Sequence, residues 1–239
     1  MEVSLKDLKI KLFADGADLS TMISMANLDY IQGLTTNPTL MRKAGISDYK
    51  KFALQVLNEI TSKPISFEIF CDDFEEMIYQ GMEIASWGDN VYVKIPVTSS
   101  TGESSIKVID HLVKNKVKVN VTALLTTAQV AQVLQALDPE IPSYISVFAG
   151  RIADTGRDPV EIMSNSLELM KTHTYSELIW ASPRELLNIF QADSIGCHVI
   201  TATPDLLNKL KLVGKNLDEY SLETVQMFRQ DAIASGYTL

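Results

Sequence analysis

Short apolar runs alternate along the chain with longer stretches in which apolar residues recur at helical spacing. The runs are rich in β-branched and aromatic residues, as expected of buried strands. Eight of them lie at residues 10–14, 30–34, 65–70, 91–95, 117–121, 144–148, 177–180 and 197–201. Because a helix after each strand returns the chain to the same end of the sheet, the strands should pair in parallel. The pattern predicts an α/β fold, a (β/α)8 TIM barrel, with a doubly wound open sheet as the alternative.

Apolar stripes at helical spacing mark the intervening helices. The clearest stripe covers residues 49–60, behind a candidate N-cap at Ser47. A second covers residues 74–85 and consists of Phe74, Met77, Ile78, Gly81, Met82 and Ala85. Similar patterns occur at residues 130–137 and 206–213. These stripes provide the faces with which helices would cover the sheet.

The chain is expected to form a single domain over residues 1–239, because no linker-like tract divides it. Residues 217–239 lie beyond the eighth unit and predict an additional C-terminal helix. Leu222, Val225 and Phe228 recur there at roughly helical spacing. A terminal helix of this kind usually packs on its own barrel, and in a minority of cases it covers a neighbouring subunit.

The composition favours a well-packed protein that acts on small molecules. Hydrophobic residues make up 46% of the chain, which is enough for a substantial core. A formal net charge of −9 argues against nucleic-acid and membrane partners, which require a basic surface. Cys71 and Cys197 form no metal-binding motif, and we expect no metal and no organic cofactor. Without a secretory leader or a long apolar run, a cytoplasmic location is expected.

Lys94 is the most informative residue, because it lies in an otherwise apolar strand. Strand alternation places Val91, Val93 and Ile95 on one face and Lys94 with Tyr92 on the other. Burial lowers the pKa of a lysine, and the neutral amine that results can form a Schiff base with a carbonyl. The alternative is a lysine on an edge strand that discourages aggregation while its ammonium group reaches water. The strand alone leaves both interpretations open.

Other polar residues gather where the predicted strands end, which is where barrel enzymes build their active sites. In chain order they are Asp15, Thr35, Asn37, Glu68, Asn120, Thr122, Ser146, Arg151, Ser182 and Arg184. Some have an ordinary explanation: Asp15 as a turn residue, Asn37 as a helix cap and Thr122 as a common strand residue. Together with Lys94, however, the set provides a nucleophile, proton carriers and an anion clamp, which is the chemistry of a carbon–carbon lyase.

Two motifs give the chain a specific resemblance to a known family. Thr-Thr-Asn-Pro occupies residues 35–38, and Val-Lys-Ile-Pro-Val-Thr occupies residues 93–98. Further landmarks are Phe-Ala-Asp at 13–15, Asn-Val-Thr at 120–122, Ser-Val-Phe-Ala-Gly-Arg at 146–151 and Ala-Ser-Pro-Arg at 181–184. On these residues nearly the whole chain resembles the transaldolase family, in particular its short members, which are similar to fructose-6-phosphate aldolases.

The resemblance implies a class I aldol mechanism that uses no metal. Lys94 would form a Schiff base with a ketose phosphate, either sedoheptulose 7-phosphate or fructose 6-phosphate, and Asp15 would take the proton of the C4 hydroxyl. The dihydroxyacetone unit kept on Lys94 would pass to glyceraldehyde 3-phosphate or erythrose 4-phosphate, as in the non-oxidative pentose phosphate pathway. Glu68 and Thr122 would position a water that carries protons. The resemblance further implies substrate contacts from Thr35, Asn37, Asn120 and Ser146 and phosphate contacts from Arg151, Ser182 and Arg184.

The resemblance favours group transfer over simple aldol cleavage. Fructose-6-phosphate aldolases tend to carry glutamine at the position of Glu68 and tyrosine at that of Phe148. A fructose-6-phosphate aldolase and a non-catalytic sugar-phosphate-binding barrel are the alternatives. Pro183 and Glu185, on either side of Arg184, depart from the commoner family pattern. The short family members also imply a homo-oligomer, such as a decamer built from pentamers.

Overall fold

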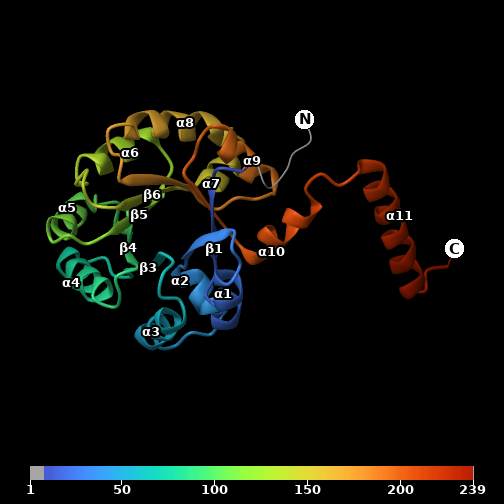
Figure 1. Cartoon of the computed structure of the whole chain (residues 1–239), viewed down its shortest axis with the longest axis horizontal. Coiled ribbons are helices and arrows are strands. Elements are labelled where there is room, and N and C mark those ends of the chain that lie inside the picture. Colours follow the sequence, from blue (N-terminus) through green and yellow to red (C-terminus); the bar gives the residue numbers. More distant parts are fainter. Residues whose placement is uncertain (1–7, 239) are drawn as a thin grey trace.

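A closed barrel of parallel strands forms the centre of the protein in a computed structural model that describes residues 8–238 (Figure 1). Each strand pairs in parallel with its neighbours in sequence, and β1 closes the ring against β8. The strands are β1 Lys11–Asp15, β2 Ile31–Thr35, β3 Ile65–Glu68, β4 Val91–Pro96, β5 Val119–Leu124, β6 Ser143–Val147, β7 Ser176–Trp180 and β8 Val199–Ala202. The predicted TIM barrel is therefore confirmed, and the open-sheet alternative is excluded.

Helices follow the strands, and most of them cover the outside of the barrel (Figure 1). They are α1 Leu19–Ala26, α2 Pro38–Lys43, α3 Tyr49–Glu59, α4 Phe74–Ala85, α5 Ile106–Lys114, α6 Thr127–Leu134, α7 Ala149–Ala153, α8 Pro159–Met170, α9 Leu187–Ser194, α10 Pro204–Leu207, the 3-10 helix η2 Asn208–Leu212 and α11 Leu217–Ala234. The predicted stripes correspond to α3, α4, α6 and the pair formed by α10 and η2.

Two local predictions about these helices are wrong. The N-cap of α3 is Asp48, whose carboxylate accepts a hydrogen bond from the Lys51 amide; Ser47 lies one residue too early for this role. In α4, the predicted stripe includes Met82, which is 40% exposed, while Ile84 is buried in its place. The stripe of α4 is thus rotated by a fraction of a turn relative to the expected one.

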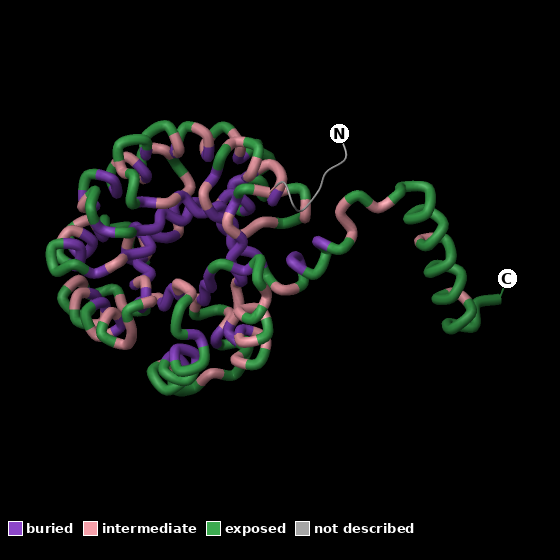
Figure 2. Tube along the Cα trace, in the orientation of Figure 1, coloured by how far each residue is buried: buried purple, intermediate pink, exposed green. Residues whose placement is uncertain are grey.

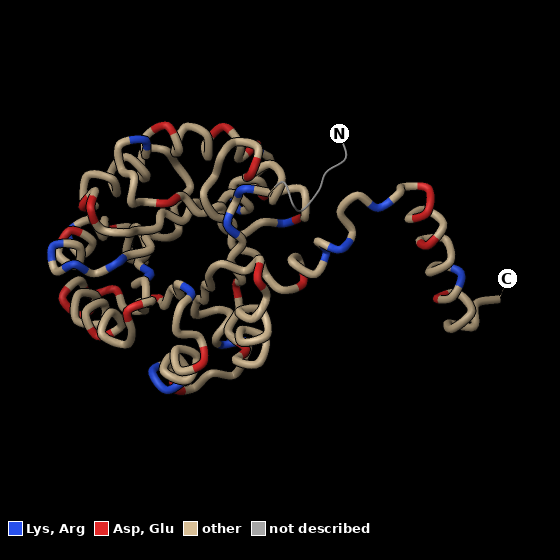
Figure 3. The backbone as a smooth tube through the Cα atoms, viewed as in Figure 1, with Lys and Arg blue, Asp and Glu red and all other residues tan. Residues whose placement is uncertain are grey.

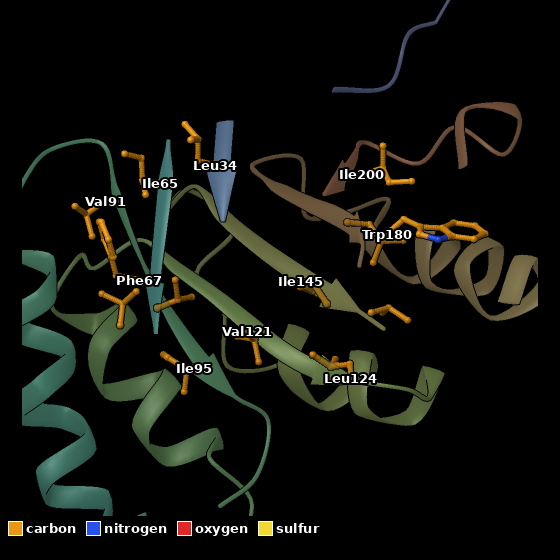
Figure 4. Packing of buried hydrophobic residues seen from close by; sticks show 14 of the residues in the cluster. Leu34, Ile65, Phe67, Val91, Ile95, Val121, Leu124, Ile145, Trp180 and Ile200 are labelled. Carbon is orange, nitrogen blue, oxygen red and sulfur yellow. The ribbon is translucent and has the colours of Figure 1, made fainter. Parts of the chain in front are cut away.

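The core divides into a large outer cluster and a small inner one. Val91, Val93 and Ile95 face outward and are buried in the outer cluster, between the sheet and the helices. Figure 4 shows the side chains of Val91 and Ile95 in this cluster. Phe13 and Tyr144 belong to the inner cluster, and their rings meet edge to face with centroids 5.6 Å apart. Since β1 and β6 are not neighbours in the barrel, this contact crosses its interior. The lumen is therefore filled by side chains, and ligands are confined to its ends.

The inner packing explains a glycine on β2. A Cβ atom built on Gly33 would lie 2.4 Å from Cζ of Phe13, far inside van der Waals contact. Gly33 is paired with Phe13 in the register of β1 and β2, so only a residue without a side chain leaves room for the ring. The Phe13 ring packs inside the barrel two residues before Asp15 on the same strand, so it lies beneath the end of the barrel that Asp15 occupies.

The C-terminal helix α11 does not pack on its own barrel, contrary to the commoner behaviour of such helices. It extends away from the barrel, and none of its residues is buried (Figures 1 and 2). Phe228, for example, is 63% exposed, and Leu222 and Val225 are exposed as well. Acidic residues and one arginine lie along the same helix (Figure 3). Across residues 8–238, the structure contains no helix with both the length and the apolar character needed to span a bilayer.

Candidate active site

A pocket of about 420 Å³ opens at the end of the barrel where the strands finish. Nine of the predicted site residues line it: Asp15, Thr35, Asn37, Glu68, Lys94, Thr122, Ser146, Arg151 and Ser182. The register explains this convergence, since Asp15 is paired with Thr35 and Lys94 is paired with Glu68 on adjacent strands. Two predicted residues, Asn120 and Arg184, are not among the lining residues.

Lys94 is a buried cation with a carboxylate partner. Its side chain is only 8% exposed, and Nζ lies 3.0 Å from Oε2 of Glu68. Nζ also donates a hydrogen bond to the backbone oxygen of Thr36, at 3.0 Å. Because β4 is paired on both sides within a closed barrel, Lys94 is not on a sheet edge, and the edge-strand interpretation is wrong.

Asp15 is the second carboxylate of the pocket and ends β1 instead of sitting in a turn. Its Oδ1 accepts a hydrogen bond of 2.7 Å from Oγ1 of Thr35. Burial raises the pKa of Asp15 above its ordinary value. The positive charge of Lys94 and the Thr35 hydrogen bond oppose this rise in pKa, and the negative charge of Glu68 adds to it. Asp15 is thus a carboxylate poised to take up a proton.

Asn37 is both a helix cap and a pocket-lining residue. It caps α2, with its side-chain oxygen accepting from the Leu40 amide at 3.0 Å, and Pro38 takes the first position of the helix. It also lines the pocket. Capping uses only the amide oxygen, so the side-chain NH₂ group remains for a ligand.

Thr122 presents a hydroxyl that has no hydrogen-bond partner among the described residues, although it is buried. The residue after it, Ala123, has a left-handed backbone with φ of 65°, and the pairing of β5 with β6 shifts register there. Ser182, with φ of 57°, is a second non-glycine residue in this conformation that lines the pocket. Backbone strain and an unpaired buried hydroxyl are both characteristic of functional sites.

Asn120 lies beneath the pocket and is fully buried. Its Oδ1 accepts from the hydroxyl of Ser146 at 2.7 Å, and its Nδ2 donates to the hydroxyl of Ser66 at 2.9 Å. These two hydrogen bonds hold the buried amide in place. Ser66 was not foreseen from the sequence, although strand alternation places it two residues before Glu68 on the same face.

The two arginines occupy different places. Arg151, on α7, lines the pocket, and its guanidinium lies 5.7 Å from the centre of the Phe148 ring. Arg184 is held instead by Asp154, through a hydrogen bond of 3.0 Å from Nε to Oδ1 and a second bond from Nη2 to Oδ2. Arg184 is therefore exposed outside the pocket lining, with its charge already paired.

Thr201 on β8 is a pocket residue that the sequence reasoning missed. Its hydroxyl lies 2.6 Å from that of Thr35. Alternation within the last strand puts Val199 and Thr201 on one face, and this signal could have identified Thr201 as an inward-facing residue. Threonine is so common in strands that its presence alone does not indicate a site.

The closed barrel and the polar pocket at the carboxyl ends of its strands define a TIM-barrel enzyme. The sequence profile of one family, described as transaldolase/fructose-6-phosphate aldolase, matches residues 12–238. The chain belongs to this transaldolase/fructose-6-phosphate aldolase family.

Curated relatives agree with this assignment. A protein of Dehalococcoides mccartyi named "probable transaldolase" is 32% identical over 202 residues, covering 84% of this chain and 90% of the relative. One of Streptococcus agalactiae with the same name is 33% identical over 196 residues, covering 80% and 85%. Among solved structures, a dihydrodipicolinate synthase family protein of Coccidioides immitis superposes with a TM-score of 0.63 over 97% of this chain and 80% of that one. Its sequence identity is 11%, so it supports the fold alone.

Proposed function

We propose that the protein is a transaldolase that carries a dihydroxyacetone unit between sugar phosphates as a Schiff base on Lys94. The observation that carries this proposal is the position of Lys94, buried at the barrel mouth with Glu68 at 3.0 Å and Asp15 in the same pocket. A lysine amine with two nearby carboxylates has the groups needed for carbonyl attack and for proton transfer. We place the reaction in the non-oxidative pentose phosphate pathway of the cytoplasm.

In the first step, Nζ of Lys94 gives up a proton and attacks C2 of the ketose, and loss of water yields the iminium ion. Glu68 is the group within reach to accept that proton, because its Oε2 lies 3.0 Å from Nζ. The unpartnered hydroxyl of Thr122 is suited to hold the water that leaves and later returns. The two residues together would shuttle protons during formation and breakdown of the carbinolamine.

In the second step, Asp15 takes the proton of the C4 hydroxyl. The C3–C4 bond breaks, its electron pair moves into the iminium, and an aldose phosphate leaves while the enamine stays on Lys94. The raised pKa of Asp15 suits this role, because it makes the carboxylate a better base. Attack of the enamine on a second aldose phosphate reverses these movements and completes the transfer.

Hydroxyl and amide groups around Lys94 would hold the three-carbon unit. Thr35, Asn37 and Ser146 line the pocket and offer donors and acceptors for its oxygens. Asn120 would act from below, because its second Nδ2 hydrogen is not used by Ser66.

The phosphate would bind at the other side of the pocket, near Arg151 and Ser182. Arg184 would join them by exchanging one of its bonds to Asp154 for a bond to phosphate. A guanidinium has five donor hydrogens, so it can serve both anions.

Simple cleavage of fructose 6-phosphate is the second candidate function. Phe148 favours transfer instead. Phe148 lines the pocket but has no hydroxyl with which to protonate the enamine or to activate water. The retained fragment is then released mainly to an incoming aldehyde. A barrel that only binds sugar phosphates would have no need of the Lys94, Glu68 and Asp15 constellation.

Trapping tests the proposal directly. The protein is incubated with fructose 6-phosphate and borohydride, digested, and mapped by mass spectrometry. The reduced three-carbon unit should be found on Lys94 and should disappear in Lys94→Met. Lys114→Met, which changes an exposed lysine on α5, serves as the control and should label normally. Label on another residue, or unchanged label in Lys94→Met, would overturn the mechanism. Assays with and without erythrose 4-phosphate then separate transfer from cleavage.

We also propose that the protein is a homo-oligomer in which α11 packs on another copy. Leu222, Val225 and Phe228 lie exposed on this helix, and their burial elsewhere would be strongly favourable. Light scattering should show an assembly, and Phe228→Asp should dissociate it. Gln226→Asp on the same helix is the charge-matched control, since Gln226 is already polar and exposed. A wild-type protein that is monomeric at micromolar concentration would contradict this proposal.

A further inference from the structure

The hydroxyl of Thr201 is connected to Asp15 through the hydroxyl of Thr35. The Thr201 and Thr35 oxygens are 2.6 Å apart, and Thr35 lies 2.7 Å from Oδ1 of Asp15. Both threonines are almost completely buried, at 7% and 2% exposed. The three residues come from adjacent strands, because β1 is paired with both β2 and β8.

Counting protons fixes the direction of these hydrogen bonds. An ionised carboxylate only accepts, so the single hydroxyl proton of Thr35 is directed to Asp15. Thr35 then has only lone pairs to offer Thr201, and Thr201 must be the donor. The order is Thr201 to Thr35 to Asp15.

We propose that Thr201 is a positioning residue that acts through Thr35 to orient Asp15 and to stabilise its ionised form. This inference rests on the proposed function, in which Asp15 accepts the C4 hydroxyl proton. Donation by Thr201 polarises the Thr35 hydroxyl and strengthens its bond to the carboxylate. Thr201 therefore sets how strong a base Asp15 is without touching the substrate carbon that reacts.

The same pair of hydroxyls accommodates Asp15 after it has taken up the proton. Protonated Asp15 can donate to Thr35, and Thr35 can then turn its own hydrogen toward Thr201. The Thr201 hydrogen turns into the pocket that this residue lines. No covalent bond changes in the threonines, and return of the proton to the sugar oxygen restores the first arrangement.

The charges around Asp15 make this contribution useful. The charged residues that line the pocket beside it are Lys94 from β4, Glu68 from β3 and Arg151 from α7. Burial and Glu68 raise the pKa of Asp15, whereas Lys94 and the Thr35 hydrogen bond lower it. From the two strands paired with β1, Thr35 and Thr201 face it with hydroxyls. A change in the hydroxyl chain should therefore be readable as a change in the protonation of Asp15.

The experiment measures the protonation of Asp15 by infrared spectroscopy on protein labelled with ¹³C-aspartate. The band of Asp15 is identified by its loss in Asp15→Asn. Thr201→Val keeps the shape of the side chain but removes the donor, and it should raise the pKa of Asp15 by roughly half a unit, or about three-fold in the ionisation constant. Thr201→Ser keeps the donor and should restore the wild-type pKa. Thr201→Cys, a weaker donor, should give a smaller rise and provides a second variant if Thr201→Val folds poorly.

An unchanged pKa in Thr201→Val and Thr201→Cys, or a lowered one, would overturn the inference and leave Thr201 as a packing residue. The acid limb of the pH profile of kcat/KM should move upward by the same amount as the pKa. Because the titration needs no substrate, it is independent of the trapping experiment at Lys94. If the three-carbon unit is trapped on Lys94 but the pKa of Asp15 does not change in Thr201→Val, only the role of Thr201 is wrong. If the pKa changes but nothing is trapped, only the proposed function is wrong.

Discussion

Arg184 and Asp154 are joined by two parallel hydrogen bonds, from Nε and Nη2 of the guanidinium to the two carboxylate oxygens. The hydrogen bond from Arg184 is the main cause that lowers the pKa of Asp154, and the charge of Arg151 contributes further. The carboxylate is thus ionised over the whole physiological range. A negative charge therefore stands beside the arginines that we assign to phosphate.

Asp154→Asn should tighten the binding of phosphate. The substitution removes the negative charge that competes for Arg184, so the competitive inhibition constant of inorganic phosphate should fall about three-fold at constant ionic strength. Asp138→Asn, which changes a partly exposed aspartate paired with Lys116, controls for the change in net charge. Weaker inhibition in Asp154→Asn would mean that Asp154 serves to orient Arg184.

Phe148→Tyr combined with Glu68→Gln should increase aldol cleavage relative to transfer. The new hydroxyl supplies a proton donor beside the enamine, and glutamine removes the carboxylate that shuttles protons through water. The measurement is the ratio of dihydroxyacetone released to heptulose phosphate formed. An unchanged ratio in the double variant would argue against the assignment of transfer to these two residues.

Gly150→Ala should severely destabilise the protein. The new Cβ would lie 1.6 Å from the backbone oxygen of Ser182, which cannot move without displacing the loop after β7. Overpacking against backbone should cost about 3 kcal/mol or more in the free energy of unfolding, measured by denaturant titration. Gly16→Ala is the matched control, because a Cβ there would meet no atom within 4 Å. Equal unfolding free energies for the two variants would show that this close approach is not rigid.

Asp15→Asn should stabilise the protein at neutral pH. Burial raises the pKa of Asp15 in the folded state, so between the ordinary aspartate pKa and the raised one the folded state holds a proton that the unfolded state has already lost. The stability of the wild type therefore falls as the pH rises from the ordinary aspartate pKa to the raised one. Asparagine does not ionise, so Asp15→Asn avoids this loss of stability. The stability difference between Asp15→Asn and the wild type should disappear in acid. Thermal melting across pH measures the difference, and an Asp15→Asn protein no more stable than the wild type at pH 7 contradicts this prediction.

The sequence predicted the barrel because its apolar period changes so regularly between strand and helix. Lys94 was recognisable for a related reason: a lysine in a strand with apolar residues on both sides requires a partner. Strand ends were less certain, and β5, for example, begins at Val119 and extends past the strained Ala123. Such a bulge depends on the pairing with β6, which the local sequence does not encode.

Other features arise only when distant segments meet. The bond between Asp154 and Arg184 depends on the close approach of α7 to the loop after β7, which Gly150 permits. The hydroxyl of Thr201 gains a role only because β8 closes the ring beside β1. The detached position of α11 was likewise hidden, because an apolar stripe shows that a helix is covered but not by which molecule.

If α11 packs on another copy, as we propose, its own order would depend on protein concentration. None of its 18 residues is buried, the helix stands away from the barrel (Figure 1), and a lone helix is only marginally stable in water. If another copy supplies the covering surface, the helix is stabilised by mass action and not by the folding of its own chain. Damage to its apolar residues would then appear as loss of order on dilution, while the melting temperature of the barrel stays the same.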